Sequence, residues 1–186
     1  MSYYFNLEEV KKELLAAKMY SLRFEMMLTF KLNNLKELCG RLPEENEIFF
    51  IETKKSFTAF TFIVYVLKNA GRLEHLYIAT YSTNERIINA LLRWQEKGLI
   101  GTIHLHISET IKFRMPKIFT RLMDLAEEGT IELSFAWSHK KITCMQTADG
   151  QFTVEGSGNY GENAMEEQYI FLRSKQIYEF RSGRIN

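Results

Sequence analysis

The chain of 186 residues is long enough to form one domain with a substantial buried core. Hydrophobic residues make up 46% of it and charged residues 25%, a balance typical of a globular protein and not of a disordered or fibrous one. The net charge of +1 excludes a general attraction to polyanions, so any affinity for phosphate must come from a local cluster of charges.

The cysteines and the apolar runs of the sequence further limit the classes of protein to which the chain can belong. Cys39 and Cys144 are the two cysteines of the chain, and their spacing indicates neither a disulfide framework nor a zinc site. No apolar run approaches the ~20 residues needed to cross a bilayer. The first residues also lack the basic start and apolar run of a signal peptide. We therefore expect a cytoplasmic protein that has no contact with membranes.

The elements at the start of the chain have no recognisable motif. Asn6 and Glu9 form a capping pair that predicts the beginning of a helix. Residues 20–32 are apolar at every second position, which predicts a long half-buried strand. A short helix then opens at Asn34 and is predicted to end near Gly40.

Strands and helices alternate over the middle of the chain. The strands predicted are Glu47–Thr53, His75–Tyr81, Thr102–Ser108 and Ile131–Trp137; the helices between them are Thr58–Asn69, a helix opened by Ser82–Glu85 that continues through Lys97, and Pro116–Glu128. Alternation of strands with helices of about a dozen residues predicts crossover units in a largely parallel sheet with helices on both faces.

The last part of the chain has a different pattern. Lys141–Gln146 and Gln151–Glu155 flank the turn sequence Thr-Ala-Asp-Gly, which predicts a hairpin. Gln168–Arg173 supplies a final strand. The sequence contains no linker, repeat or low-complexity segment, so we expect a single α/β domain over residues 1–186.

Polar side chains that could take part in a reaction lie just before and just after this hairpin in the sequence. His139 and Lys141 are two residues apart at the start of a strand, so both side chains leave the same face. Ser157 and Asn159 repeat that spacing at the end of the second strand. Normal pairing of the hairpin would bring an imidazole, an ammonium, a hydroxyl and a carboxamide together. Such a set suits a phosphate ester, because it offers a nucleophile, a positive charge and two uncharged donors.

The order of these residues resembles the signature of the phospholipase D superfamily: His-x-Lys, four residues, Asp, then Gly-Ser-x-Asn and a later Glu. His139 and Lys141 match the first part, and Gly156, Ser157 and Asn159 match the second. Glu167 is similar to the late glutamate, with Glu166 as the neighbouring candidate. The motif covers residues 139–172. The resemblance implies a three-layer sandwich with a mixed, mostly parallel sheet and helices on both faces, and the helix and strand expected over 7–32 match no part of the motif.

One position departs from that signature. The family's Asp would fall at position 146, where this chain has Gln146, and Asp149 in the hairpin turn restores the spacing to Gly-Ser. Because the family's Asp has a supporting role, its replacement brings turnover into question more than phosphate binding. A catalytically inactive phospholipase D-like module for nucleic-acid binding or assembly is therefore the alternative to an enzyme.

The resemblance also implies a mechanism. Enzymes of this superfamily resemble a two-fold assembly of His-x-Lys halves, so a chain with one motif implies a homodimer. His139 would be the nucleophile that forms a phosphohistidine and, in the second copy, the general acid. Lys141, Ser157 and Asn159 would bind phosphate and Glu167 would orient a histidine, with no metal or cofactor required. We expect a phosphodiesterase that acts on nucleic acid, because local basic clusters are present and a membrane segment is not.

Weaker signals surround this motif. Four residues are candidate contacts to the substrate phosphates: Lys54 and Lys55 after a predicted strand, and Lys112 and Arg114 in a basic stretch. A second basic cluster consists of Arg173, Lys175, Arg181 and Arg184. We interpret His104 and His106 as ordinary sheet histidines, and Trp94 and Trp137 as packing residues.

Overall fold

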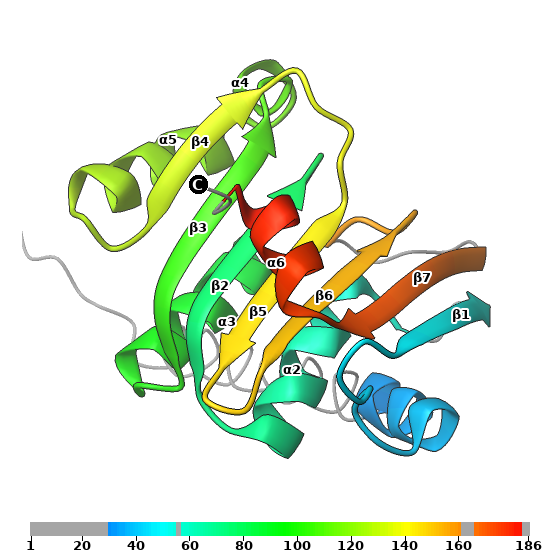
Figure 1. The fold of residues 1–186 in the computed structure, drawn as a ribbon. Helices are drawn as coiled ribbons and strands as arrows, with labels where there is room; N and C mark the ends of the chain where they lie inside the picture. The colour runs from blue at the N-terminus through cyan, green and yellow to red at the C-terminus, as the bar shows by residue number, and fades with distance from the viewer. Residues whose placement is uncertain (1–29, 55–56, 161–165, 184–186) are drawn as a thin grey trace, which may run out of the picture.

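The computed structural model describes residues 30–54, 57–160 and 166–183. Within this part of the chain a seven-stranded sheet forms the centre, in the order β1-β7-β6-β5-β2-β3-β4 (Figure 1). Its strands are β1 (Ile48–Lys54), β2 (Leu73–Thr80), β3 (Ile100–Ser108), β4 (Glu132–Ala136), β5 (Ile142–Thr147), β6 (Gln151–Gly156) and β7 (Glu166–Arg173). The helices with both ends described are α2 (Ala59–Ala70), α3 (Glu85–Glu96), α4 (Ile111–Arg114), α5 (Pro116–Glu127) and α6 (Lys175–Ser182).

The sheet is mixed and largely antiparallel, so the expectation of a mostly parallel sheet is wrong. Only the pairs β2–β3 and β3–β4 are parallel among the described strands, whereas β1–β7, β7–β6, β6–β5 and β5–β2 are antiparallel. The crossover through α2 does leave β1 and β2 pointing the same way. The three strands β5, β6 and β7 are inserted between them, and local sequence patterns carry no information about that insertion.

Strand direction determines which chain ends share an edge of the sheet. The strands β1, β2, β3, β4 and β6 point one way, and β5 and β7 point the other way. The carboxyl ends of the first five strands and the amino ends of the other two therefore meet at one edge. We call it the carboxyl edge.

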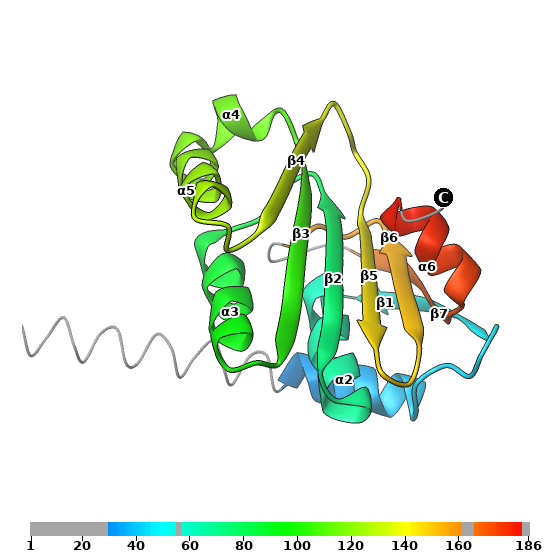
Figure 2. The same cartoon turned by 60° about the vertical axis from the view of Figure 1, so that its left-hand side comes forward.

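Helices cover one face of the sheet almost completely. The buried core on this face includes Leu35, most of α2, and the apolar sides of α3 and α5. The first eight residues of α2 are all buried in this core, and the buried Thr58 and Thr61 form a capping box at its first turn. Asn84 caps α3 by accepting a hydrogen bond from the backbone N–H of Ile87 at 3.1 Å. Figure 2 shows α3 and α5 on this side of the sheet and α6 on the other.

The helix α6 packs on the opposite face, over β5 and β6. Its Tyr178 contributes to a small second core with Ala79, Ile142 and Cys144. Arg181 of α6 also forms an ion pair with Glu155 of β6, in which its Nε and Nη2 groups donate to the two carboxylate oxygens. The sequence patterns did not predict α6, because eight mostly polar residues carry little periodic signal.

The start of the described chain corrects another expectation. Residues 30–39 are helical, so the strand predicted over residues 20–32 is wrong at its end, and its remainder lies outside the described residues. Leu32 and Leu35 are three positions apart and both buried, as one face of a helix requires. The helix ends before Gly40, as predicted. No helix among the described residues is long and apolar enough to span a membrane.

Candidate functional site

The carboxyl edge brings together the motif residues that are far apart in the sequence. His139 and Lys141 precede β5, Ser157 and Asn159 follow β6, and Glu167 is the second residue of β7. The pairing of β6 with both β5 and β7 fixes this arrangement. The backbone N–H of Gly156 also donates to the carbonyl of Lys141 at 3.3 Å, which ties the two motif segments directly.

His139 and Lys141 are in contact on the exposed side of this edge. The Nζ atom of Lys141 lies 3.0 Å from Nδ1 and 3.4 Å from Nε2 of His139, and 3.3 Å from its carbonyl oxygen. An ammonium group can only donate, so the imidazole accepts in this contact. A phosphate oxygen that attracted the ammonium would therefore release the ring nitrogen for chemistry.

The charge of Lys141 is subject to opposing influences. Partial burial lowers the pKa of Lys141, while the negative charge of nearby Glu167 acts in the opposite direction. The Lys141 ammonium thus contacts the imidazole of His139 and is influenced by the negative charge of Glu167. A partly buried ammonium in this position is suited to binding an anion, since it has already lost part of its hydration.

Tyr81 and Arg114 extend the site beyond the motif. The ring of Tyr81 lies 5.0 Å from the ring of His139, and Nη1 of Arg114 donates to the Tyr81 hydroxyl at 2.5 Å. Hydrogen bonds from Thr110 and Arg114 lower the pKa of Tyr81. Sequence reasoning missed Tyr81; its position immediately after β2, at the same edge as His139, was the available signal.

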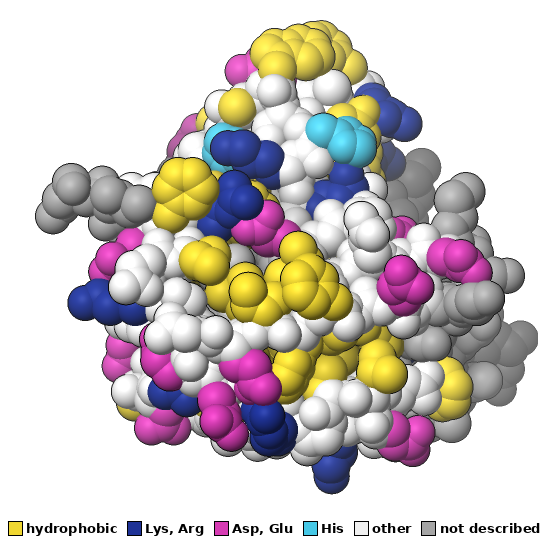
Figure 3. Space-filling model, turned by 45° about the vertical axis from the view of Figure 1, so that its right-hand side comes forward, with side chains coloured by type: hydrophobic (Ala, Val, Ile, Leu, Met, Phe, Trp, Pro, Cys, Tyr) yellow, Lys and Arg dark blue, Asp and Glu magenta, His cyan; other side chains and the backbone are white. Residues whose placement is uncertain are grey.

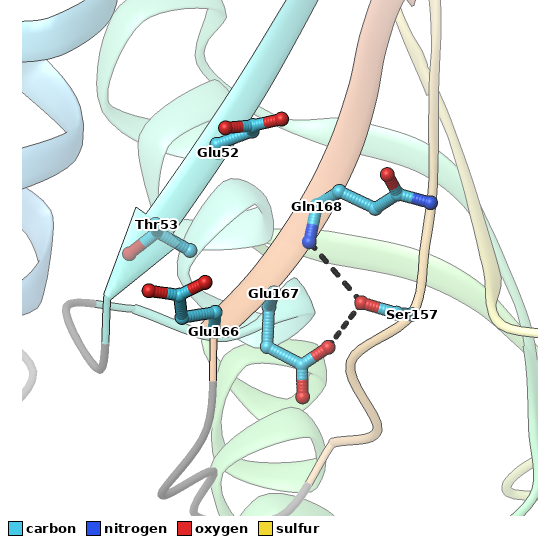
Figure 4. A pocket seen from close by; sticks show the side chains of 6 residues that line it. All are labelled: Glu52, Thr53, Ser157, Glu166, Glu167 and Gln168. Carbon is cyan, nitrogen blue, oxygen red and sulfur yellow. Dashed lines mark hydrogen bonds between the residues drawn. The ribbon is translucent and has the colours of Figure 1, made fainter.

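Ser157 links β6 to the start of β7. Its hydroxyl donates to the carboxylate of Glu167 and accepts from the backbone N–H of Gln168 at 3.1 Å, as Figure 4 shows. The Ser157 backbone N–H donates to the Gln168 carbonyl at 3.1 Å. Within the described residues no hydrogen bond joins Glu167 to His139, so Glu167 positions Ser157 in this structure.

Asn159 lies deeper than Ser157. Its Oδ1 atom is buried and accepts no hydrogen bond from any residue that the structure describes. The next residue, Tyr160, is buried and hydrogen-bonded to the Thr143 hydroxyl under the site, which fixes the backbone at Asn159. A buried acceptor without a donor is costly, so Asn159 is a position where a ligand or water that supplies a donor would be favourable.

An open pocket lies beside this site. It has a volume of about 470 Å³ and is lined by Glu52, Thr53, Ser157, Glu166, Glu167 and Gln168 (Figure 4). Three of these residues are carboxylates, which repel a phosphate group. The electrostatics therefore favour an anion on the other side of Ser157, towards Lys141 and His139.

The structure places Gln146 away from the carboxyl edge. Gln146 lies near the far end of β5, and its side-chain amide donates to Glu74 at 3.1 Å. Five residues of extended strand separate it from Lys141, or about 16 Å. Asp149 is further away still, in the turn beyond β5. The residue at position 146 therefore contributes to the opposite edge of the sheet and does not touch the His139–Lys141 pair.

The structure places the four residues predicted to contact substrate phosphates in different surroundings. Lys112 lies 3.6 Å from Glu109 and over the rings of Phe119 and Phe135. Arg114 contacts Tyr81, as described above, and Tyr81 in turn contacts the His139 ring. Lys54 ends β1 at the carboxyl edge, but its side chain and all of Lys55 lie outside the described part of the chain.

The second basic cluster is largely neutralised. Arg173 forms an ion pair with Glu45 at 3.2 Å, Arg181 pairs with Glu155, and Lys175 lies 3.8 Å from Glu179. Arg184 lies outside the described residues. This cluster therefore offers little free positive charge to a polyanion.

The remaining histidines and tryptophans are also placed by the structure. His104 Nε2 and His106 Nδ1 each lie 2.9 Å from the hydroxyl of Ser134. No group of three His, Cys, Asp or Glu residues that could hold a metal ion occurs in the described ranges. Trp94 stacks on Phe60 as a packing residue, but Trp137 is 75% exposed, so its interpretation as a packing residue is wrong.

The fold is similar to part of a much longer enzyme. The sequence matches no family model and no curated protein. The structure is similar to the crystal structure of polyphosphate kinase from Porphyromonas gingivalis, with a TM-score of 0.55 and 15% identity over 74% of this chain and 25% of that one. At this identity the likeness shows the fold alone.

Two further structures are more distant. TrmBL2, an archaeal chromatin protein, gives a TM-score of 0.47 at 13% identity over 95% of this chain and 62% of its own. Phosphatidylserine synthase from Haemophilus influenzae Rd KW20 gives a TM-score of 0.47 at 11% identity over 74% of this chain and 37% of its own. The chain thus spans less than two thirds of each of these three proteins.

Proposed function

We propose that this protein is a metal-independent phosphodiesterase that cleaves nucleic acid through a phosphohistidine at the interface of a homodimer. The observation that carries the proposal is the contact between His139 and Lys141 on an exposed edge, beside Ser157 and Asn159. The phospholipase D-like fold supports it, because the motif lies where two strands of that fold begin and end.

In the proposed reaction a phosphate oxygen draws the Lys141 ammonium away from the imidazole. A ring nitrogen of His139 then forms a bond to phosphorus, and the bond from phosphorus to the leaving oxygen breaks. His139 of the second copy, in its protonated form, gives its proton to that oxygen. The now neutral His139 of the second copy then takes a proton from water. This water attacks the phosphohistidine, breaks its bond from nitrogen to phosphorus and releases the phosphate monoester. Lys141 from both copies stabilises the charge on the phosphoryl oxygens.

The test measures cleavage of an end-labelled oligonucleotide by the purified full chain, with and without chelator. Cleavage that is unchanged by chelator and abolished in His139→Ala is the expected result, and Lys141→Ala should lose about 10²–10³-fold in rate. His75→Asn is the matched control, because it removes an imidazole from β2 near the opposite edge of the sheet. A nucleotide adduct on the wild-type chain, labile to acid and absent from His139→Ala, identifies the intermediate.

Analytical ultracentrifugation measures independently whether the chain is a dimer in solution. A monomer at the concentration of full activity, inhibition by chelator, or full activity of His139→Ala would each contradict the proposal. The alternative, an inactive module for nucleic-acid binding or assembly, is favoured by the engagement of Glu167 with Ser157 instead of His139. A dimer that binds the oligonucleotide but never cleaves it would establish that alternative.

A further inference from the structure

Two aromatic side chains stand out from the carboxyl edge beside the candidate site. Phe113 in α4 is 79% exposed and Trp137 after β4 is 75% exposed. Burial of an aromatic ring is strongly favourable, so an exposed pair next to a polar site requires a reason. Figure 3 shows hydrophobic side chains at the upper rim of this face, close to histidine and to lysine or arginine side chains.

The structure connects both aromatic residues to His139. Phe113 directly precedes Arg114, whose guanidinium lies over the Tyr81 ring at 5.5 Å, and Tyr81 in turn contacts His139. Trp137 is two residues before His139, so their Cα atoms are at most about 7 Å apart. The segments that carry the two rings are also joined, because the Glu109 backbone N–H donates to the Ala136 carbonyl at 2.9 Å.

Positive charge is interleaved with these rings. Arg114 follows Phe113, and the exposed Lys140 follows His139. Neither Arg114 nor Lys140 forms an ion pair with another residue in the part of the chain that is described. Burial lowers the pKa of His106, and the positive charge of nearby Lys140 lowers it further. We call Phe113, Arg114, Trp137 and Lys140 the aromatic rim.

We infer that the aromatic rim binds single-stranded nucleic acid, with unpaired bases stacked on Trp137 and Phe113 and backbone phosphates held by Arg114 and Lys140. Aromatic faces interleaved with cations are the common means of binding single strands, since every base has a face that can stack. A duplex presents no such faces along its length, because its bases are already stacked on one another.

This inference rests on the proposed function and specifies its substrate class. A base on Trp137 would place a neighbouring phosphate beside His139, so the rim would deliver the strand to the site. A membrane surface is the competing partner for exposed aromatic residues. The unpaired cations at Arg114 and Lys140 and the proximity of the rim to a phosphate-ester site favour the nucleic acid.

The test uses a dodecamer of deoxythymidine and the duplex of the same length, each titrated into His139→Ala so that binding is measured without cleavage. Trp137 can be observed alone in the additional Trp94→Phe background, because the chain has two tryptophans. We expect the single strand to quench Trp137 fluorescence and to bind at least about tenfold more tightly than the duplex. Trp137→Ala and Phe113→Ala should each weaken binding about 5- to 150-fold.

Phe50→Ala and Phe180→Ala are the matched controls, because these rings are 79% and 63% exposed on β1 and α6, away from the rim. Equal effects of rim and control variants, or equal affinity for duplex and single strand, would overturn the inference. The inference would also be overturned if the aromatic rim were required for binding to vesicles of phosphatidylcholine and phosphatidylserine but not for binding to the oligonucleotide. If the oligonucleotide binds through the aromatic rim but the wild type does not cleave it, the proposed function alone is refuted. If the wild type cleaves it and rim variants cleave it equally well, this inference alone is refuted.

Discussion

The replacement of Gly156 by alanine tests whether the motif glycine is required by the sheet. A Cβ atom at Gly156 would lie 2.4 Å from the carbonyl oxygen of Gln168 and 2.5 Å from Cδ1 of Tyr169. Both obstacles belong to β7, and Tyr169 is packed against Phe57 and Phe62 in the core. The contact with the carbonyl must open to at least 3.0 Å, a displacement of about 0.6 Å, so β6 and β7 must separate.

The energetic cost follows from what that separation breaks. Overpacking of this kind costs about 1–3 kcal/mol. The Gln168 carbonyl also accepts the backbone hydrogen bond of Ser157 at 3.1 Å, whose loss adds about 0.5–1.5 kcal/mol. Restriction of the unfolded chain by alanine returns about 0.4–1 kcal/mol. We expect a net loss of about 0.5–4 kcal/mol in the free energy of unfolding, or roughly 1–16 °C in Tm for a chain of this size.

Urea and thermal unfolding, followed by circular dichroism, measure this change. Gly150→Ala is the matched control in the same hairpin, because its Cβ would meet only the end of the flexible Arg173 side chain. That side chain can move away, so Gly150→Ala should remain within about 0.5 kcal/mol of the wild type. If the two variants have the same stability, close approach of β6 and β7 is not the reason for glycine in the motif.

Two further predictions concern titratable groups. Two hydrogen bonds from Arg41, at 2.6 and 2.8 Å, lower the pKa of Glu47 to about 2. Because the folded pKa is depressed, this carboxylate stabilises the protein above the unfolded pKa of about 4.3 and loses that effect as pH falls towards 2. The stability difference between wild type and Glu47→Gln in urea should therefore be larger at pH 7 than at pH 3, and a difference independent of pH would contradict the assignment. Burial raises the pKa of the Cys144 thiol to about 12 and that of Cys39 to about 11. Neither should react with a disulfide reagent at pH 8 within minutes while the protein is folded, both should react in urea, and fast labelling of the folded chain would show that these thiols are accessible.

The sequence by itself determined the local elements and the chemistry of the motif. The order of His139, Lys141, Ser157 and Asn159 was enough to propose a phosphate site, although all four residues lie just outside β5 and β6 and not on a strand face. A Thr-Ala-Asp-Gly turn between two apolar runs was also sufficient to place β5 beside β6. These features depend on interactions between residues close in the chain, which is why they are readable from it.

Only the tertiary structure decided what lies next to the motif. The pairing of β1 with β7, across more than a hundred residues, made the sheet largely antiparallel and brought Glu167 to the carboxyl edge. The same packing placed Gln146 at the opposite end of β5 and put Tyr81 against the His139 ring. It also left Trp137 exposed, whereas Trp94 is partly buried and stacked on Phe60. Long-range strand pairing and burial depend on the whole chain, so no local pattern could distinguish these outcomes.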